Sequence, residues 1–203
     1  MSATRRRINA AALRLFAERG SVDLTMSELA TEAGVARGTL YRNVESIEQL
    51  FEQVRAQLAF ELHSANAQAM DAHGDLDPPL RLSTGTRMIV RMAHENPAAG
   101  RFVVRFALTD ESLREMLTGP PMRDVAAGIA SGRYVVAPGM ELSIASMLMG
   151  TVVSAMWMVL EGHQSWRDAA AGAAELMLCA LGVPHDEARR IAASPLPATA
   201  FEV

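Results

Sequence analysis

With 203 residues, of which half are hydrophobic and 21% are charged, the chain has the composition of an ordinary globular protein with one or two domains. The formal net charge of −4 argues against a nucleic-acid partner for the chain as a whole. The charge is unevenly distributed, however. Residues 1–43 carry seven arginines and four acidic residues, whereas residues 44–203 carry twelve arginines and nineteen acidic residues. A basic N-terminal part joined to an acidic remainder is typical of a protein that contacts DNA through one end only.

Cysteine content and apolar segments indicate the cellular compartment in which the protein works. The single cysteine, Cys179, excludes an intramolecular disulfide and fits a reducing cytosol. Residues 1–7 lead directly into an amphipathic helix with no apolar signal core, so we expect a cytoplasmic protein. Residues 142–160 carry no charge and are long enough to span a bilayer. Interrupting hydroxyl residues and the acidic flanks Glu141 and Glu161 favour a buried helix and no membrane.

Helical periodicity dominates the chain and strand signals are scarce, so the fold class is predicted to be all-α. A first amphipathic helix covers about residues 4–19 and ends at Gly20. A second begins at a cap formed by Thr25 or Ser27 and ends where Gly34 permits a sharp turn. A third short helix follows directly, which gives the geometry of a helix-turn-helix.

The third helix is predicted to present a DNA-reading surface. Val35 and Leu40 anchor it to the core, which leaves a small, polar and basic face free for a major groove. Arginines on this face can reach phosphates or guanine edges, hydroxyl and amide groups can hydrogen-bond either, and a tyrosine hydroxyl can reach phosphate. The residues predicted to face outward are Ala36, Arg37, Gly38, Thr39, Tyr41, Arg42 and Asn43. Arg5, Arg6 and Arg7 are either a solvated tail or further contacts to the flanking DNA backbone.

The remaining elements form a second domain. A long helix over about residues 46–72 connects the two parts, and residues 73–79 form a loop. Further helices are predicted over residues 80–95, 98–108, 110–117, 120–132, 140–161 and 166–181, with a short turn or helix at 186–193 and a loose tail from 195. We therefore divide the chain into a DNA-binding domain at 1–45 and a ligand-binding and dimerisation domain at 46–203.

The last two long helices are predicted to join two copies of the chain. The helix at 140–161 is apolar all round, which is more apolar surface than one chain of this size covers. Small residues at Gly150, Ser154 and Gly172 allow helices to approach closely. A homodimer would place two recognition helices roughly 34 Å apart on a near-palindromic site of double-stranded DNA.

Many of the thirteen methionines fall in the helices of the second domain. Methionine is flexible and polarisable, so such a set can line a cavity for a small apolar effector, although each member can equally be an ordinary core residue. The wider set includes Met116, Met122, Met149 and Met156. The residues that we select as effector contacts are Met88, Met92, Phe102, Phe106, Met147, Thr151 and Met158.

Catalysis and metal binding find no support in the sequence. The five histidines are scattered, without the spacing of a metal site, and neither a phosphate-binding glycine loop nor a nucleophile motif is present. We therefore expect no metal, no cofactor and no enzymatic activity.

Residues 8–50 resemble the N-terminal domain of the TetR family of bacterial transcriptional regulators. The segment Ala11-Ala12-Leu13-Arg14-Leu15-Phe16-Ala17-Glu18-Arg19-Gly20 matches the first helix and turn of the family, and Gly38-Thr39-Leu40-Tyr41 matches its recognition helix. Thr25-Met26 and Ile47-Glu48-Gln49-Leu50 bracket the motif. Val44 and Ile47 depart from the family pattern, which usually has an aromatic residue and a lysine at these positions.

The resemblance implies roles for individual residues. Positions matching Thr25 and Tyr41 touch phosphates, and those matching Ala36, Arg37, Thr39 and Arg42 lie nearest the bases. It also implies dimerisation through the last two long helices as a four-helix bundle. We therefore predict a homodimeric, ligand-responsive, sequence-specific DNA-binding transcriptional regulator, interpreted as a repressor that a small apolar or amphipathic effector releases. The alternatives are an activator, a ligand-independent regulator, or a small-molecule binder that does not bind an operator.

Overall fold

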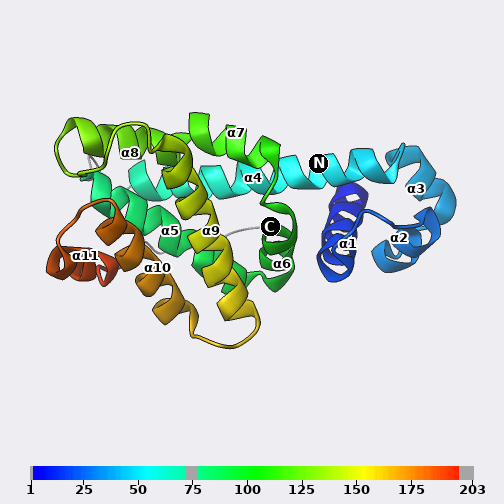
Figure 1. Ribbon diagram of the computed structural model, residues 1–203. Helices are drawn as coiled ribbons and strands as arrows, with labels where there is room; N and C mark the ends of the chain where they lie inside the picture. The colour runs from blue at the N-terminus through cyan, green and yellow to red at the C-terminus, as the bar shows by residue number, and fades with distance from the viewer. Residues whose placement is uncertain (1, 72–76, 197–203) are drawn as a thin grey trace.

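The computed structural model describes residues 2–71 and 77–196, and within these ranges it contains eleven α-helices and no strand (Figure 1). The all-α prediction is confirmed, and the predicted helices recur with ends shifted by a few residues at most. The predicted tail from residue 195 falls largely outside the described residues, and so does the predicted loop at residues 73–79 up to residue 76. The loop prediction is wrong for Pro78 and Pro79, which form the first turn of a helix, where proline needs no backbone N–H partner.

The first three helices form a compact head at one end of the molecule (Figure 1). They are α1 (Ala3–Arg19), α2 (Met26–Ala33) and α3 (Arg37–Asn43). Gly20 and Gly34 end α1 and α2 in the left-handed conformation, with φ of 66° and 62°, which glycine adopts at little cost. Fully buried side chains from all three helices fill the core of the head: Ile8, Phe16, Leu29 and Leu40.

Helix α4 (Ile47–Asp71) leaves the head and runs along the remainder of the protein (Figure 1). Its start is capped by Ser46, whose hydroxyl accepts a hydrogen bond from the Gln49 backbone N–H at 3.1 Å. Val44 and Ile47, the two departures from the family pattern, are both buried at this junction. Apolar side chains at these positions therefore belong to the core where α4 joins the head.

Seven further helices form the body of the protein, with α5 at its centre. Helix α5 packs against α6, α8, α9, α10 and α11, and most of its side chains are buried. Its contacts with α4 are far fewer. The body helices are α5 (Pro78–Glu95), α6 (Pro97–Phe106), α7 (Asp110–Thr118), α8 (Pro120–Ala130), α9 (Glu141–Leu160), α10 (Trp166–Ala180) and α11 (His185–Ala192).

Four phenylalanines join the head to the body. Phe16 of α1 meets the ring of Phe51 on α4 edge to face, with ring centroids 5.2 Å apart. Phe51 in turn lies 5.4 Å from Phe102 and 5.0 Å from Phe106, both on α6. Helix α1 also packs along α6. The head therefore shares part of its core with the body, across the predicted domain boundary.

Helix α9 combines an apolar composition with incomplete burial. Among the helices of residues 2–71 and 77–196, it is the one that is long and apolar enough to cross a membrane, judged by length and composition alone. Only 28% of its most apolar stretch of 18 residues is buried inside the chain. Core helices of soluble proteins have the same composition, but α9 leaves much of its apolar surface uncovered by the rest of this chain.

Candidate DNA-binding surface and effector pocket

The outer face of α3 carries the side chains that the sequence assigns to DNA. Leu40 is completely buried beneath the helix, whereas Tyr41 is 64% exposed. Ala36, Arg37, Gly38 and Arg42 are also exposed, and Thr39 and Asn43 are partly exposed. A side chain built at Gly38 would meet no atom within 4 Å, so this side of the helix is open to a large partner.

Hydrogen bonds orient the polar side chains of α3. The Arg37 guanidinium donates to the Ser27 hydroxyl at 2.8 Å, which links α3 to the start of α2. The Arg42 guanidinium donates to the Thr39 hydroxyl at 3.2 Å. Each arginine uses one nitrogen in these bonds, which leaves further N–H groups for phosphate or guanine acceptors.

Two arginines of the N-terminal run hold the head together. Arg5 donates to the Asn43 carbonyl at the end of α3 and to the Gln53 side chain on α4. Arg7 donates to the carbonyls of Ala33 and Gly34 at 2.9 and 2.6 Å, at the end of α2. Cations stabilise helix C-termini, where carbonyl groups lack partners. These bonds join residues far apart in the sequence and are not predictable from it, and a DNA contact by Arg5 remains a prediction.

A capping box starts α2 at the predicted phosphate contact Thr25. The Thr25 hydroxyl accepts from the Glu28 N–H at 3.2 Å, and the Glu28 carboxylate accepts from the Thr25 N–H at 2.9 Å. Hydrogen bonds from Arg19 and then from Thr25 lower the pKa of Glu28 to about 2. The box therefore ties the turn after α1 to the start of the helix-turn-helix.

We expect Thr25→Ala to lower the free energy of unfolding by about 1 kcal/mol in urea titrations at neutral pH, because α2 loses its cap.

The contribution of Glu28 to stability should depend on pH. Since the pKa of Glu28 is depressed on folding, this contribution is complete above the unfolded value of 4.5 and is lost as the pH falls toward about 2. The stability difference between the wild type and Glu28→Gln should therefore narrow over this window. A difference that stays constant with pH would contradict the role assigned to the carboxylate.

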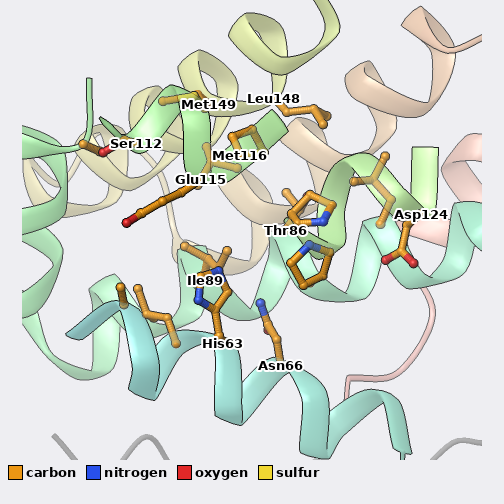
Figure 2. A pocket seen from close by; sticks show the side chains of 18 of the residues that line it. His63, Asn66, Thr86, Ile89, Ser112, Glu115, Met116, Asp124, Leu148 and Met149 are labelled. Carbon is orange, nitrogen blue, oxygen red and sulfur yellow. The ribbon is translucent and has the colours of Figure 1, made fainter. Parts of the chain in front are cut away.

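A cavity of about 500 Å³ lies in the body between α4, α5, α7, α8 and α9 (Figure 2). This volume is within the range of pockets that bind drug-sized ligands. Apolar side chains make most of its wall: Leu62, Leu82, Ile89, Val103, Met116, Leu148, Met149, Val152 and Val153. The polar lining residues are His63, Asn66, Arg81, Thr86, Ser112, Glu115, Arg123 and Asp124.

The charged groups of the pocket are paired within the protein. Arg81 of α5 donates to the Asp124 carboxylate of α8 at 3.0 Å. The Glu115 carboxylate lies 3.4 Å from Arg55 of α4, and Arg123 donates to the Thr118 carbonyl at 3.0 Å. With two arginines and two carboxylates in the lining, the pocket has no excess charge. It is therefore better suited to a neutral, partly polar ligand than to an ion.

The seven side chains that the sequence analysis selected as effector contacts do not line this cavity. Met88 and Met92 are fully buried on α5, and Phe102 and Phe106 belong to the phenylalanine cluster at the head. Met147, Thr151 and Met158 are partly buried on α9. From the wider methionine set, Met116 and Met149 do line the cavity. The signal that could have located it is the polar pair His63 and Asn66, three residues apart on one face of α4.

Within residues 2–71 and 77–196, no group of three or more histidine, cysteine or acidic side chains is arranged to hold a metal ion.

Two family profiles together match most of the chain. The family described as "Bacterial regulatory proteins, tetR family" matches residues 8–54. The family described as "Tetracyclin repressor-like, C-terminal domain" matches residues 77–194, which is more than half of the chain. Among proteins of curated function, none matches.

Solved structures share the fold over most of the chain. The structure of RolR in complex with its ligand resorcinol superposes with a TM-score of 0.69, is 30% identical, and the match covers 96% of this chain and 95% of RolR. A TetR-like regulator from Rhodococcus sp. RHA1 gives a TM-score of 0.71 at 18% identity, with 89% of this chain and 97% of that chain covered. TylP, a TetR regulator from Streptomyces fradiae, gives 0.65 at 21% identity, with 92% and 90% covered. These last two show the fold alone.

Proposed function

Since the chain belongs to the TetR family of bacterial regulators, we propose that it is a cytoplasmic repressor that binds a near-palindromic operator as a homodimer and leaves it when a neutral, hydroxyl-bearing aromatic compound enters the pocket. The chain is a ligand-responsive DNA-binding transcriptional regulator and not an enzyme. The exposed face of α3 supports the operator, the pocket supports the effector class, and the outer faces of α9 and α10 support the homodimer.

Operator binding is supported by the basic, exposed face of α3. The seven arginines and four acidic residues of the first 43 positions give the head a positive charge, although the chain is acidic overall. Each arginine that contacts a phosphate releases counterions, so affinity should fall as salt rises. The observation that carries this proposal is the open surface at Gly38, Tyr41 and Arg42 above the buried Leu40.

A shift assay on the promoter DNA of the chain's own gene tests this proposal. We expect Arg42→Ala to weaken binding by about 1–3 kcal/mol if it reads a guanine, or to reduce the salt slope by about 1 if it contacts a phosphate. Arg101→Ala is the matched control, because Arg101 is an exposed arginine on α6. Equal effects of the two variants would contradict a recognition role for α3. A chain that binds no DNA even at low salt would instead be a small-molecule binder without an operator.

The effector class is supported by the pocket and by RolR. The cavity has apolar walls, balanced charge and hydrogen-bonding groups, so it suits a neutral ring that carries hydroxyl groups. RolR, 30% identical over nearly the whole chain, was crystallised with resorcinol, a dihydroxybenzene. A cavity of about 500 Å³ also leaves room for larger hydroxylated aromatics. Resorcinol added to the shift assay should release the DNA if it is an effector, whereas toluene, which lacks hydroxyl groups, should not.

The homodimer is supported by the outer faces of α9 and α10. Large apolar side chains remain exposed there in the single chain, among them Leu142, Trp157 and Leu176 at 62%, 45% and 69% exposure. A side chain built at Gly150 or Gly172 would meet nothing within 4 Å. An open apolar face with small residues allows a second copy to approach closely and to bury α9.

A further inference from the structure

One polar group of the pocket lacks a partner inside the protein. The Asn66 side-chain oxygen is shielded from solvent and accepts no hydrogen bond, and among the described residues that line the pocket it is the only side-chain atom in this state. A buried acceptor without a donor is unfavourable, and folded proteins contain few of them. Such a group is expected where a ligand or an ordered water supplies the missing bond.

The position of Asn66 allows a ligand to supply that bond. Figure 2 shows its side chain reaching from α4 toward the cavity with the amide nitrogen foremost, beside His63 and on the side facing Thr86 and Ile89 of α5. A half-turn of the amide exchanges its nitrogen and oxygen and brings the unpaired oxygen to the cavity. An amide and an imidazole each offer both a donor and an acceptor, so together they match a neutral hydroxyl group. The charged lining groups, by contrast, already have partners, as in the Arg81–Asp124 pair.

We propose that Asn66 is the specificity-determining residue of this pocket: it binds a hydroxyl group of the effector and thereby holds α4, the helix that carries the head. This inference rests on the proposed effector class. It goes further because it assigns two properties to one side chain. These are the preference for aromatics with hydroxyl groups over those without, and the response of the head to the effector.

The link to the head follows from the place of Asn66 on α4. The helix starts in the head at Ile47, where its side chain is buried, and its distal half forms one wall of the cavity. Its direct contacts with α5, on the opposite side of the cavity, are few. A ligand that touches Asn66 and the opposite wall adds a new connection between α4 and the body. It shifts the position of α4 to the extent that it binds one arrangement more tightly than the other.

Calorimetric titration of the full chain with two probes, resorcinol and toluene, tests this role. Asn66→Leu keeps a similar volume and removes the hydrogen-bonding group. We expect it to weaken resorcinol binding by roughly 10-fold or more, with toluene binding unchanged or tighter. The concentration of resorcinol that releases the DNA should rise by the same factor. Gln68→Leu is the matched control, because Gln68 is an exposed amide two residues along the same helix and does not line the pocket.

A second measurement does not depend on the ligand. Leucine relieves the unpaired oxygen, so the melting temperature of ligand-free Asn66→Leu should equal or exceed that of the wild type. A clear fall would show that the amide already has a structural partner, and would overturn the proposal. So would unchanged resorcinol affinity in the variant, or an equal loss for both probes. If the wild type itself binds neither resorcinol nor a larger hydroxylated aromatic such as a naphthalenediol, the effector class fails and this inference fails with it.

Discussion

Gly172→Trp should leave the chain folded but monomeric, and should weaken operator binding on the order of 10²–10⁴-fold. Gly172 lies on the open side of α10, where an added side chain meets no atom within 4 Å. The change also replaces the helix-weakening glycine, so the single chain loses nothing by it. In the proposed dimer the same face lies against a second copy, and an indole there would hold the two chains apart.

The size of the expected loss comes from the linkage of two heads. In a dimer the second head binds its half-site at a high effective concentration, because the first head is already bound. A monomer keeps one recognition helix and the contacts of one half-site only. The salt slope should therefore fall along with the affinity, since about half of the phosphate contacts are lost.

Sedimentation and the shift assay together measure this prediction. Ala127→Trp is the control, since it places the same indole on the exposed face of α8, a helix that packs mainly against α5 and α7. Gly172→Ala is a milder variant. It stabilises the helix by up to about 1 kcal/mol and adds only one methyl group at the interface. A Gly172→Trp chain that sediments as a dimer and binds DNA like the wild type would place the contact between copies elsewhere.

The helices were predictable because local chemistry sets their ends. The Thr25 and Ser165 hydroxyls cap α2 and α10, and Gly20 and Gly34 close α1 and α2 in conformations that other residues avoid. The outward face of α3 was predictable for the same reason, since Leu40 fixes which side is buried. Periodicity and caps involve residues within a few positions of each other, so the sequence displays them directly.

The pocket was not predictable in this way, because it depends on which faces of distant helices converge. Methionine and phenylalanine serve a ligand cavity and an ordinary core through the same apolar surface, so composition alone does not separate the two uses. Met92 is completely buried in the core, whereas Met149 lines the cavity. Arg5 illustrates the same limit for the head. Its partners Asn43 and Gln53 lie far along the chain, and nothing local identifies them.

Phe102→Ala should lower the free energy of unfolding by about 3–5 kcal/mol, because it empties the centre of the phenylalanine cluster that joins head and body. The Phe102 side chain is only 2% exposed, and its ring lies 4.9 Å from that of Phe106 and 5.4 Å from that of Phe51. Removing it leaves a cavity between α1, α4 and α6. The head should then be held less firmly, so operator affinity should fall even under conditions where the chain stays folded.

Unfolding in urea and calorimetry on the folded variant separate this role from the effector contact that the sequence predicted for Phe102. A residue of the junction changes stability and leaves the resorcinol affinity of the folded protein near that of the wild type. A residue of the effector site lowers the resorcinol affinity and leaves the stability near that of the wild type. Phe60→Ala is the matched control, because Phe60 on α4 is 68% exposed and its loss should cost less than about 0.5 kcal/mol. If Phe102→Ala weakened effector binding while costing no more stability than Phe60→Ala, the pocket would have to extend to α6 and the phenylalanine cluster would belong to it.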